Sequence, residues 1–187
     1  GDTMPLSEAL KGLMVPSGND AAIAIATSVG ALIDPSSTNP YQTFVDAMNK
    51  KASELGLSHT VYSNPHGLDD GQWAGELHST ARDVATLFAY AMKNKDFRAI
   101  EEDTNDVISV TGADGAQRQI ELHRTNKTLG KNGNIGGKTG STDTAGECFV
   151  GAYTRDQGGE IYAVNLGSTS NDARWSDALA LANWYYD

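Results

Sequence analysis

Apolar residues recur at helical spacing through the first half of the chain. The pattern predicts four helices, at residues 6–15, 19–33, 40–56 and 79–94. Asn19 or Asp20 is a suitable N-cap for the second helix, because both side chains can accept a hydrogen bond from a free backbone N–H. Pro40 suits the first turn of the third helix, and Gly56 suits its end. The first half is therefore predicted to be helical.

The pattern changes after residue 103. Residues 106–122 alternate between apolar and polar around an Asp-Gly turn, which predicts a β-hairpin. Three strands are predicted at residues 136–141, 146–155 and 160–168, followed by an apolar helix at 172–186. Before this change, residues 58–78 are rich in Asn, Pro, Gly and Asp and predict an ordered loop between the third and fourth helices.

A block of helices followed by antiparallel strands and a closing helix predicts an α+β fold. A chain of 187 residues is long enough for one domain, or for one domain divided into two lobes around a cleft. We expect a helical lobe at about residues 1–105, with the sheet and the C-terminal helix at about 106–187.

Composition narrows the functional classes. The net charge is −10, and nucleic-acid affinity depends on contacts from basic residues to phosphates, so nucleic acid is not an expected partner. The single cysteine, Cys148, rules out an intramolecular disulfide and a multi-cysteine metal site, and the four histidines lack metal-ligand spacing. We expect no metal and no cofactor. No apolar run is long enough to cross a bilayer, and a secretion signal would have to precede residue 1.

The residues Gly137, Lys138 and Thr139 match the end of a phosphate-binding loop. That loop needs an earlier glycine at position 132, where the residue is Asn132, and a helix after the motif. The residues that follow predict a strand, which lacks the amide groups and dipole of a helix N-terminus. The pattern therefore argues against a phosphate site.

A second interpretation treats Lys-Thr-Gly at residues 138–140 as one element of a serine acyl-transfer site. Such sites pair it with a Ser-x-Asn element, and Ser17, Gly18 and Asn19 supply one at the start of a predicted helix. Each motif alone is common, but both in this order are specific. The flanking sequences are LMVPSGNDAAIAIA, FVDAMNKKASELGLSHTVYSNPHGLDD, STARDVATLF, RTNKTLG, GGKTGSTDTAGECFVGAYTRD and ARWSDALALANW. Together they resemble the low-molecular-weight penicillin-binding D-alanyl-D-alanine carboxypeptidases.

The resemblance implies a β-lactamase/transpeptidase-like fold and a serine peptidase that binds β-lactam antibiotics. Its substrate would be a peptidoglycan stem peptide ending in D-Ala-D-Ala, outside the cytoplasm. Ser17, Asn19 and Lys138 would be catalytic: Ser17 would relay protons, Asn19 would bind the substrate backbone and Lys138 would place a positive charge beside Ser17.

The resemblance also implies a set of substrate-binding residues. Thr139 would contact the substrate carboxylate within the segment that includes Gly140, and the N–H of Ser141 would form half of an oxyanion hole. Arg174 would help to hold the terminal carboxylate.

The nucleophile of this family lies in a Ser-x-x-Lys motif, which no serine of this chain begins. We therefore expect a C-terminal portion of the catalytic domain that is inactive alone, with an open sheet edge through which it self-associates. A D,D-endopeptidase, a β-lactamase of the same fold, and a non-catalytic peptide-binding module are the alternatives.

Overall fold

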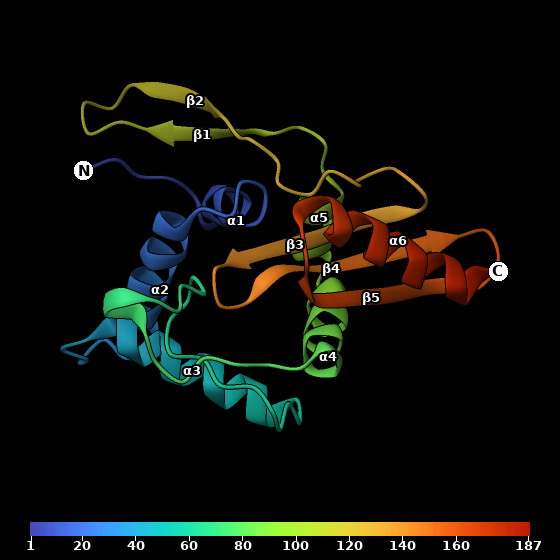
Figure 1. The fold of residues 1–187 in the computed structure, drawn as a ribbon. Coiled ribbons are helices and arrows are strands. Elements are labelled where there is room, and N and C mark those ends of the chain that lie inside the picture. The colour runs from blue at the N-terminus through green and yellow to red at the C-terminus, as the bar shows by residue number, and fades with distance from the viewer.

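The computed structural model describes residues 1–187 as six α-helices, one short 3-10 helix and five strands (Figure 1). The helices are α1 (Leu6–Met14), α2 (Asn19–Ile33), α3 (Pro40–Glu54), η1 (Gly71–Trp73), α4 (Ala81–Met92), α5 (Lys95–Glu102) and α6 (Asn171–Tyr186). The strands are β1 (Val107–Thr111), β2 (Gln117–Glu121), β3 (Asn134–Thr142), β4 (Gly146–Arg155) and β5 (Gly159–Ser168). None of the helices combines the length and apolar character that crossing a membrane requires.

The four helices predicted in the first half are confirmed, and local signals explain their ends. The side chain of Asn39 accepts a hydrogen bond from the Gln42 N–H, and Pro40 occupies the first position of α3. Gly56 has a φ of 71°, a left-handed conformation that ends the helix. Thr80 caps α4 by accepting from the Asp83 N–H.

The start of α2 corrects one prediction. Gly18 is the N-cap, Asn19 is already helical, and no side chain caps this helix. The reason is the preceding residue, because Ser17 has a φ of 63° and turns the chain into the helix one residue earlier. The short helix α5 was not predicted; the side chain of Asn94 starts it by accepting from two backbone N–H groups.

The predicted strands form two separate antiparallel sheets. Strands β3, β4 and β5 make a three-stranded sheet in sequence order, and β1 and β2 make the predicted hairpin. The hairpin packs against α1 instead of joining the larger sheet, and Thr3 pairs with Thr111 beside it. The outer edges of β3 and β5 have no strand partner. Self-association through such an edge stays a prediction.

Helices cover both faces of the larger sheet, with α6 on one face and α4 and α5 on the other (Figure 1). The alternation along β4 produces this arrangement. Phe149 packs edge-on against Trp175 of α6, whereas Val150 belongs to the buried cluster formed with Phe88 and Met92 of α4. The α+β class is therefore confirmed. Helices α4 and α5 pack on the sheet, whereas α1 to α3 do not cover either of its faces. The division into a helical lobe and a sheet lobe near residue 105 stays a prediction.

Candidate active site

The two sequence motifs meet at the outer edge of the larger sheet, beside the middle of β3. Lys138 lies in β3, Ser17 lies in the loop between α1 and α2, and Lys138 Nζ donates a hydrogen bond to Ser17 Oγ at 2.5 Å. The two residues are 121 positions apart in the chain. The fold therefore brings together the serine and the lysine that were predicted to act as a pair.

Ser17 is held in an unusual backbone conformation. Its φ of 63° is in the left-handed region, which costs a non-glycine residue about 1–2 kcal/mol. The loop is fixed on both sides, because the Gly18 N–H bonds to the Gly12 carbonyl at 3.2 Å and the Thr125 N–H bonds to the Val15 carbonyl at 3.0 Å. Such strain, held by surrounding hydrogen bonds, is common at functional sites. Here it directs the hydroxyl of Ser17 toward Lys138.

Lys138 is mostly buried, and this changes its acidity. Burial lowers the pKa of Lys138 to about 8, the negative charge of Glu101 opposes the change, and the positive charge of Arg174 reinforces it. Nζ also donates to the carbonyl of Thr139 at 2.6 Å. An amine whose pKa is this close to neutral can exchange a proton with a hydroxyl group, which is what a relay through Ser17 needs.

The other motif residues surround this pair. Thr139 is only 8% exposed, and its hydroxyl donates to Thr125 Oγ1 at 2.9 Å. Asn19 is exposed at the start of α2, and its amide makes no hydrogen bond within the chain. Gly140 is exposed on β3, where a Cβ would have only Cys148 within 4 Å. The edge of β3 is therefore open beside Lys138.

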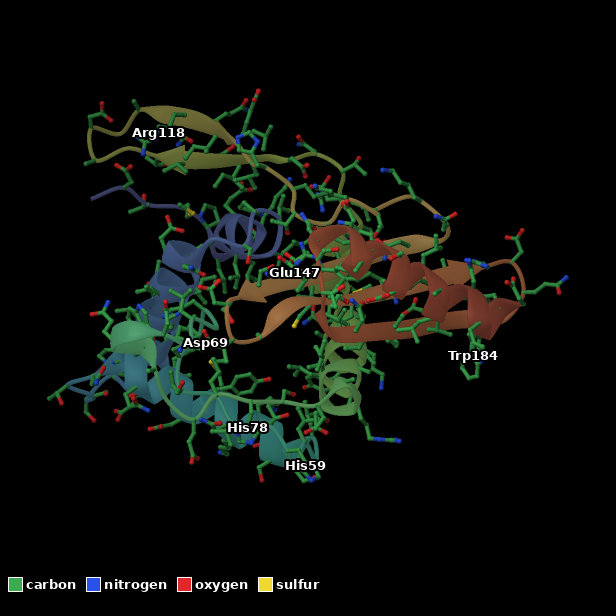
Figure 2. All side chains as sticks on the ribbon, in the orientation of Figure 1. His59, Asp69, His78, Arg118, Glu147 and Trp184 are labelled. Carbon is green, nitrogen blue, oxygen red and sulfur yellow. The ribbon has the colours of Figure 1, made fainter.

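Arg174 lies in the first turns of α6 and is 6% exposed. Its guanidinium group donates to Ser141 Oγ at 2.8 Å and pairs with Glu147 at 2.6 Å, and Ser141 itself donates to Glu147 at 2.6 Å. The fold thus places Arg174 beside Ser141 and adds a carboxylate that compensates the arginine charge. Glu147, labelled in Figure 2, was not identified from sequence, since no motif marks it.

Glu101 is a second acidic residue that sequence reasoning missed. It lies on α5 beneath β3, and its Oε2 accepts a hydrogen bond from the Gly137 N–H at 2.7 Å. Burial raises the pKa of Glu101 to about 7, although the Gly137 hydrogen bond and the charges of Arg124 and Lys138 oppose this. The site therefore contains a buried carboxyl group and a partly buried amine, and burial moves the pKa of each toward neutral pH.

The loop at residues 58–78 contacts the C-terminal end of β3, four residues beyond Lys138. Asp69, labelled in Figure 2, accepts a hydrogen bond from Thr142 Oγ1 at 2.7 Å and so joins the loop to the end of β3. Within the loop, the rings of His66 and Trp73 pack edge-on, 4.5 Å between centroids. Nowhere in the chain do three or more His, Cys, Asp or Glu side chains gather as metal ligands would.

Comparisons with known proteins agree with this geometry. A family model described as D-alanyl-D-alanine carboxypeptidase matches residues 1–170. The chain is 34% identical over 186 residues to the D-alanyl-D-alanine carboxypeptidase of Streptomyces sp. (strain K15), covering 98% of this chain and 62% of that protein. It is 31% identical over 186 residues to D-alanyl-D-alanine carboxypeptidase DacB2 of Mycobacterium tuberculosis, covering 98% of this chain and 59% of that protein.

Solved structures show the same likeness. The crystal structure of the Streptomyces K15 DD-transpeptidase superposes with a TM-score of 0.87 at 33% identity, covering 99% of this chain and 69% of that chain. The D-alanyl-D-alanine carboxypeptidase of Mycobacterium tuberculosis H37Rv superposes with a TM-score of 0.74 at 29% identity, covering 97% and 64%. The chain spans about three fifths of the length of the curated relatives it matches.

Proposed function

Because the chain belongs to the D-alanyl-D-alanine carboxypeptidase family, we propose that its site serves a serine acyl-transfer reaction on peptidoglycan stem peptides that end in D-Ala-D-Ala. In that reaction a serine attacks the peptide carbonyl, the terminal D-alanine leaves, and water releases the acyl group. The contact of Lys138 Nζ with Ser17 Oγ, at 2.5 Å, is the observation that carries the proposal.

Ser17 and Lys138 have the properties that proton transfer requires. The positive charge of Lys138 favours loss of the Ser17 proton, and the lowered pKa of Lys138 lets its ammonium group supply a replacement proton to Ser17 Oγ. Ser17 would pass a proton to the nitrogen of the departing D-alanine. This relay needs the hydroxyl and the amine in contact, which the strained conformation of Ser17 maintains.

The open edge of β3 suits an extended peptide. An unpaired strand edge presents alternate N–H and C=O groups with which a peptide can pair. The N–H of Ser141 would be half of an oxyanion hole, the amide of Asn19 would bind the peptide backbone, and the hydroxyl of Thr139 would meet the terminal carboxylate. Arg174, which donates to Ser141 Oγ and pairs with Glu147, would help to hold the terminal carboxylate.

These 187 residues contain no Ser-x-x-Lys, the motif that holds the nucleophile in the family that the chain resembles. We therefore propose that this chain alone binds the substrate without being acylated. The intact mass before and after incubation with benzylpenicillin tests this directly. We expect no added mass, and an adduct would mean that another residue performs the attack.

Binding is tested by titrating the ¹⁵N-labelled chain with an N-acylated peptide ending in D-Ala-D-Ala, using the L-Ala-L-Ala peptide as control. We expect shifts at Lys138 and its neighbours on β3 with the D,D peptide only. Lys138→Met should weaken binding at least about tenfold, because a charge-assisted contact is lost. Lys131→Met removes the same charge at an exposed position and should leave binding unchanged. Equal binding of the D,D and L,L peptides would instead indicate a general peptide-binding module.

The solved relatives from Streptomyces are called DD-transpeptidases, which favours a second candidate reaction. In transpeptidation an amine from another peptide accepts the acyl group instead of water. Both reactions share the proton relay and the carboxylate contacts, so the binding test serves both. Peptidoglycan, the substrate of both reactions, lies outside the cytoplasmic membrane. We therefore propose that this chain acts on the outer side of that membrane.

A further inference from the structure

Glu101 occupies an unusual position for a carboxylate. It is 4% exposed, its Oε2 accepts from the Gly137 N–H at 2.7 Å, and its Oε1 has no hydrogen-bond partner. A buried oxygen of this kind is costly unless a nearby charge compensates it. The residue before Lys138 is therefore tied to a buried acid that the proposed reaction does not use.

The glycines before Lys138 make this contact possible. A Cβ on Gly136 would lie 2.7 Å from Glu101 Cβ and 2.9 Å from Glu101 Oε2. Any larger residue at Gly136 would push α5 away from β3. The Gly136-Gly137 pair thus allows the carboxylate to reach the main chain one residue before the site lysine.

The charges around Glu101 point to Lys138 as its partner. Two cations act on Glu101, and one of them, Arg124, already pairs with Asp106. Lys138 has no carboxylate within salt-bridge distance, and its side-chain contacts are Ser17 and a backbone carbonyl. The negative charge of Glu101 keeps the pKa of Lys138 from falling further.

The other elements packed against α5 do not supply a competing partner. On the α1 side, Lys11 pairs at 2.6 Å with Asp103, which follows the end of α5. On the α4 side, the contact is apolar, formed by Phe88 and Phe97. Of the two cations near Glu101, Lys138 is therefore the one that no other carboxylate pairs with.

We propose that Glu101 is a positioning residue of this site, which holds the main chain of β3 at Gly137 and supplies the negative charge that balances Lys138. Both actions serve the contact between Lys138 and Ser17. The inference rests on the proposed function only in treating Lys138 as a catalytic group, and its test needs no substrate turnover.

The test measures the titration of Lys138 by NMR in protein labelled with ¹³C at the lysine side chains, the signal being assigned by its loss in Lys138→Arg. In Glu101→Gln the amide oxygen can still accept from the Gly137 N–H, but the charge is gone. We expect the pKa of Lys138 to fall by about one unit. Glu102→Gln removes the same charge from an exposed neighbour on α5 and should leave the pKa of Lys138 unchanged.

Two further readouts separate charge from packing. Glu101→Ala removes the acceptor as well, so the Gly137 amide should exchange its hydrogen faster than in Glu101→Gln. In the unmodified protein, the Lys138 signal should also record the titration of Glu101 near pH 7, which requires no variant to fold. An identical Lys138 titration in the wild type and Glu101→Gln, or no response near pH 7, would overturn the inference even if the D,D peptide binds. Failure of the peptide to bind would instead affect only the proposed function.

Discussion

Asn134 joins the start of β3 to two other segments, and replacing it with alanine tests how this strand is anchored. The side chain is 2% exposed and makes three hydrogen bonds, each of 3.1 Å. Its Nδ2 donates to the carbonyls of Gly136 and Ala152, and its Oδ1 accepts from Asn126 Nδ2. These bonds span the irregular pairing between Asn134 and Gly136, where the ladder to β4 shifts register.

The expected cost of Asn134→Ala follows from these contacts. A typical buried hydrogen bond contributes about 1 kcal/mol net, and buried partners left unpaired cost at least as much, so we expect a loss of about 3 kcal/mol. Urea unfolding at constant m-value would measure it. Asn105→Ala is the control, because Asn105 is exposed and its side chain makes no hydrogen bond, and should change stability by less than about 0.5 kcal/mol. A loss for Asn134→Ala below about 1 kcal/mol would mean that these three hydrogen bonds do not anchor the strand.

Two more predictions concern packing and pH. A Cβ on Gly30 would lie 1.8 Å from the carbonyl oxygen of Pro40, so Gly30→Ala must separate α2 from α3. We expect it to lower the free energy of unfolding by more than about 2 kcal/mol in thermal or urea unfolding. The control is Gly12→Ala, which should be neutral or stabilising because the nearest contacts of its Cβ lie at 3.8 Å. Burial raises the pKa of Glu101 from 4.5 to about 7 in the folded state, so the folded protein favours the protonated carboxyl. The stability that comes from this preference is fully present below about pH 4.5 and is lost as the pH rises through 7. Stability of the wild type relative to Glu101→Gln should therefore fall by about 3 kcal/mol over this range, and a difference that is independent of pH would contradict the assignment.

Much of the architecture follows from periodicity. The helical spacing of the first half and the alternation after residue 103 predicted every α-helix except α5 and all five strands, because both patterns reflect which face of an element is buried. Helix α5 has only eight residues, too short for its apolar positions to establish a period. The N-cap of α2 was wrong because it depends on the left-handed conformation of Ser17, which residue preference does not predict.

Residue types and their spacing were enough to predict the α+β class, the family resemblance and the two motifs that contain Ser17 and Lys138. These depend on residue type and on local spacing, which can be read along the chain. Three contacts appear only in the folded chain: Lys138 with Ser17, Glu101 with the N–H of Gly137, and Glu147 with Arg174. Such contacts join residues that are 27 to 121 positions apart. Their energies depend on burial, which exists only once the layers have packed.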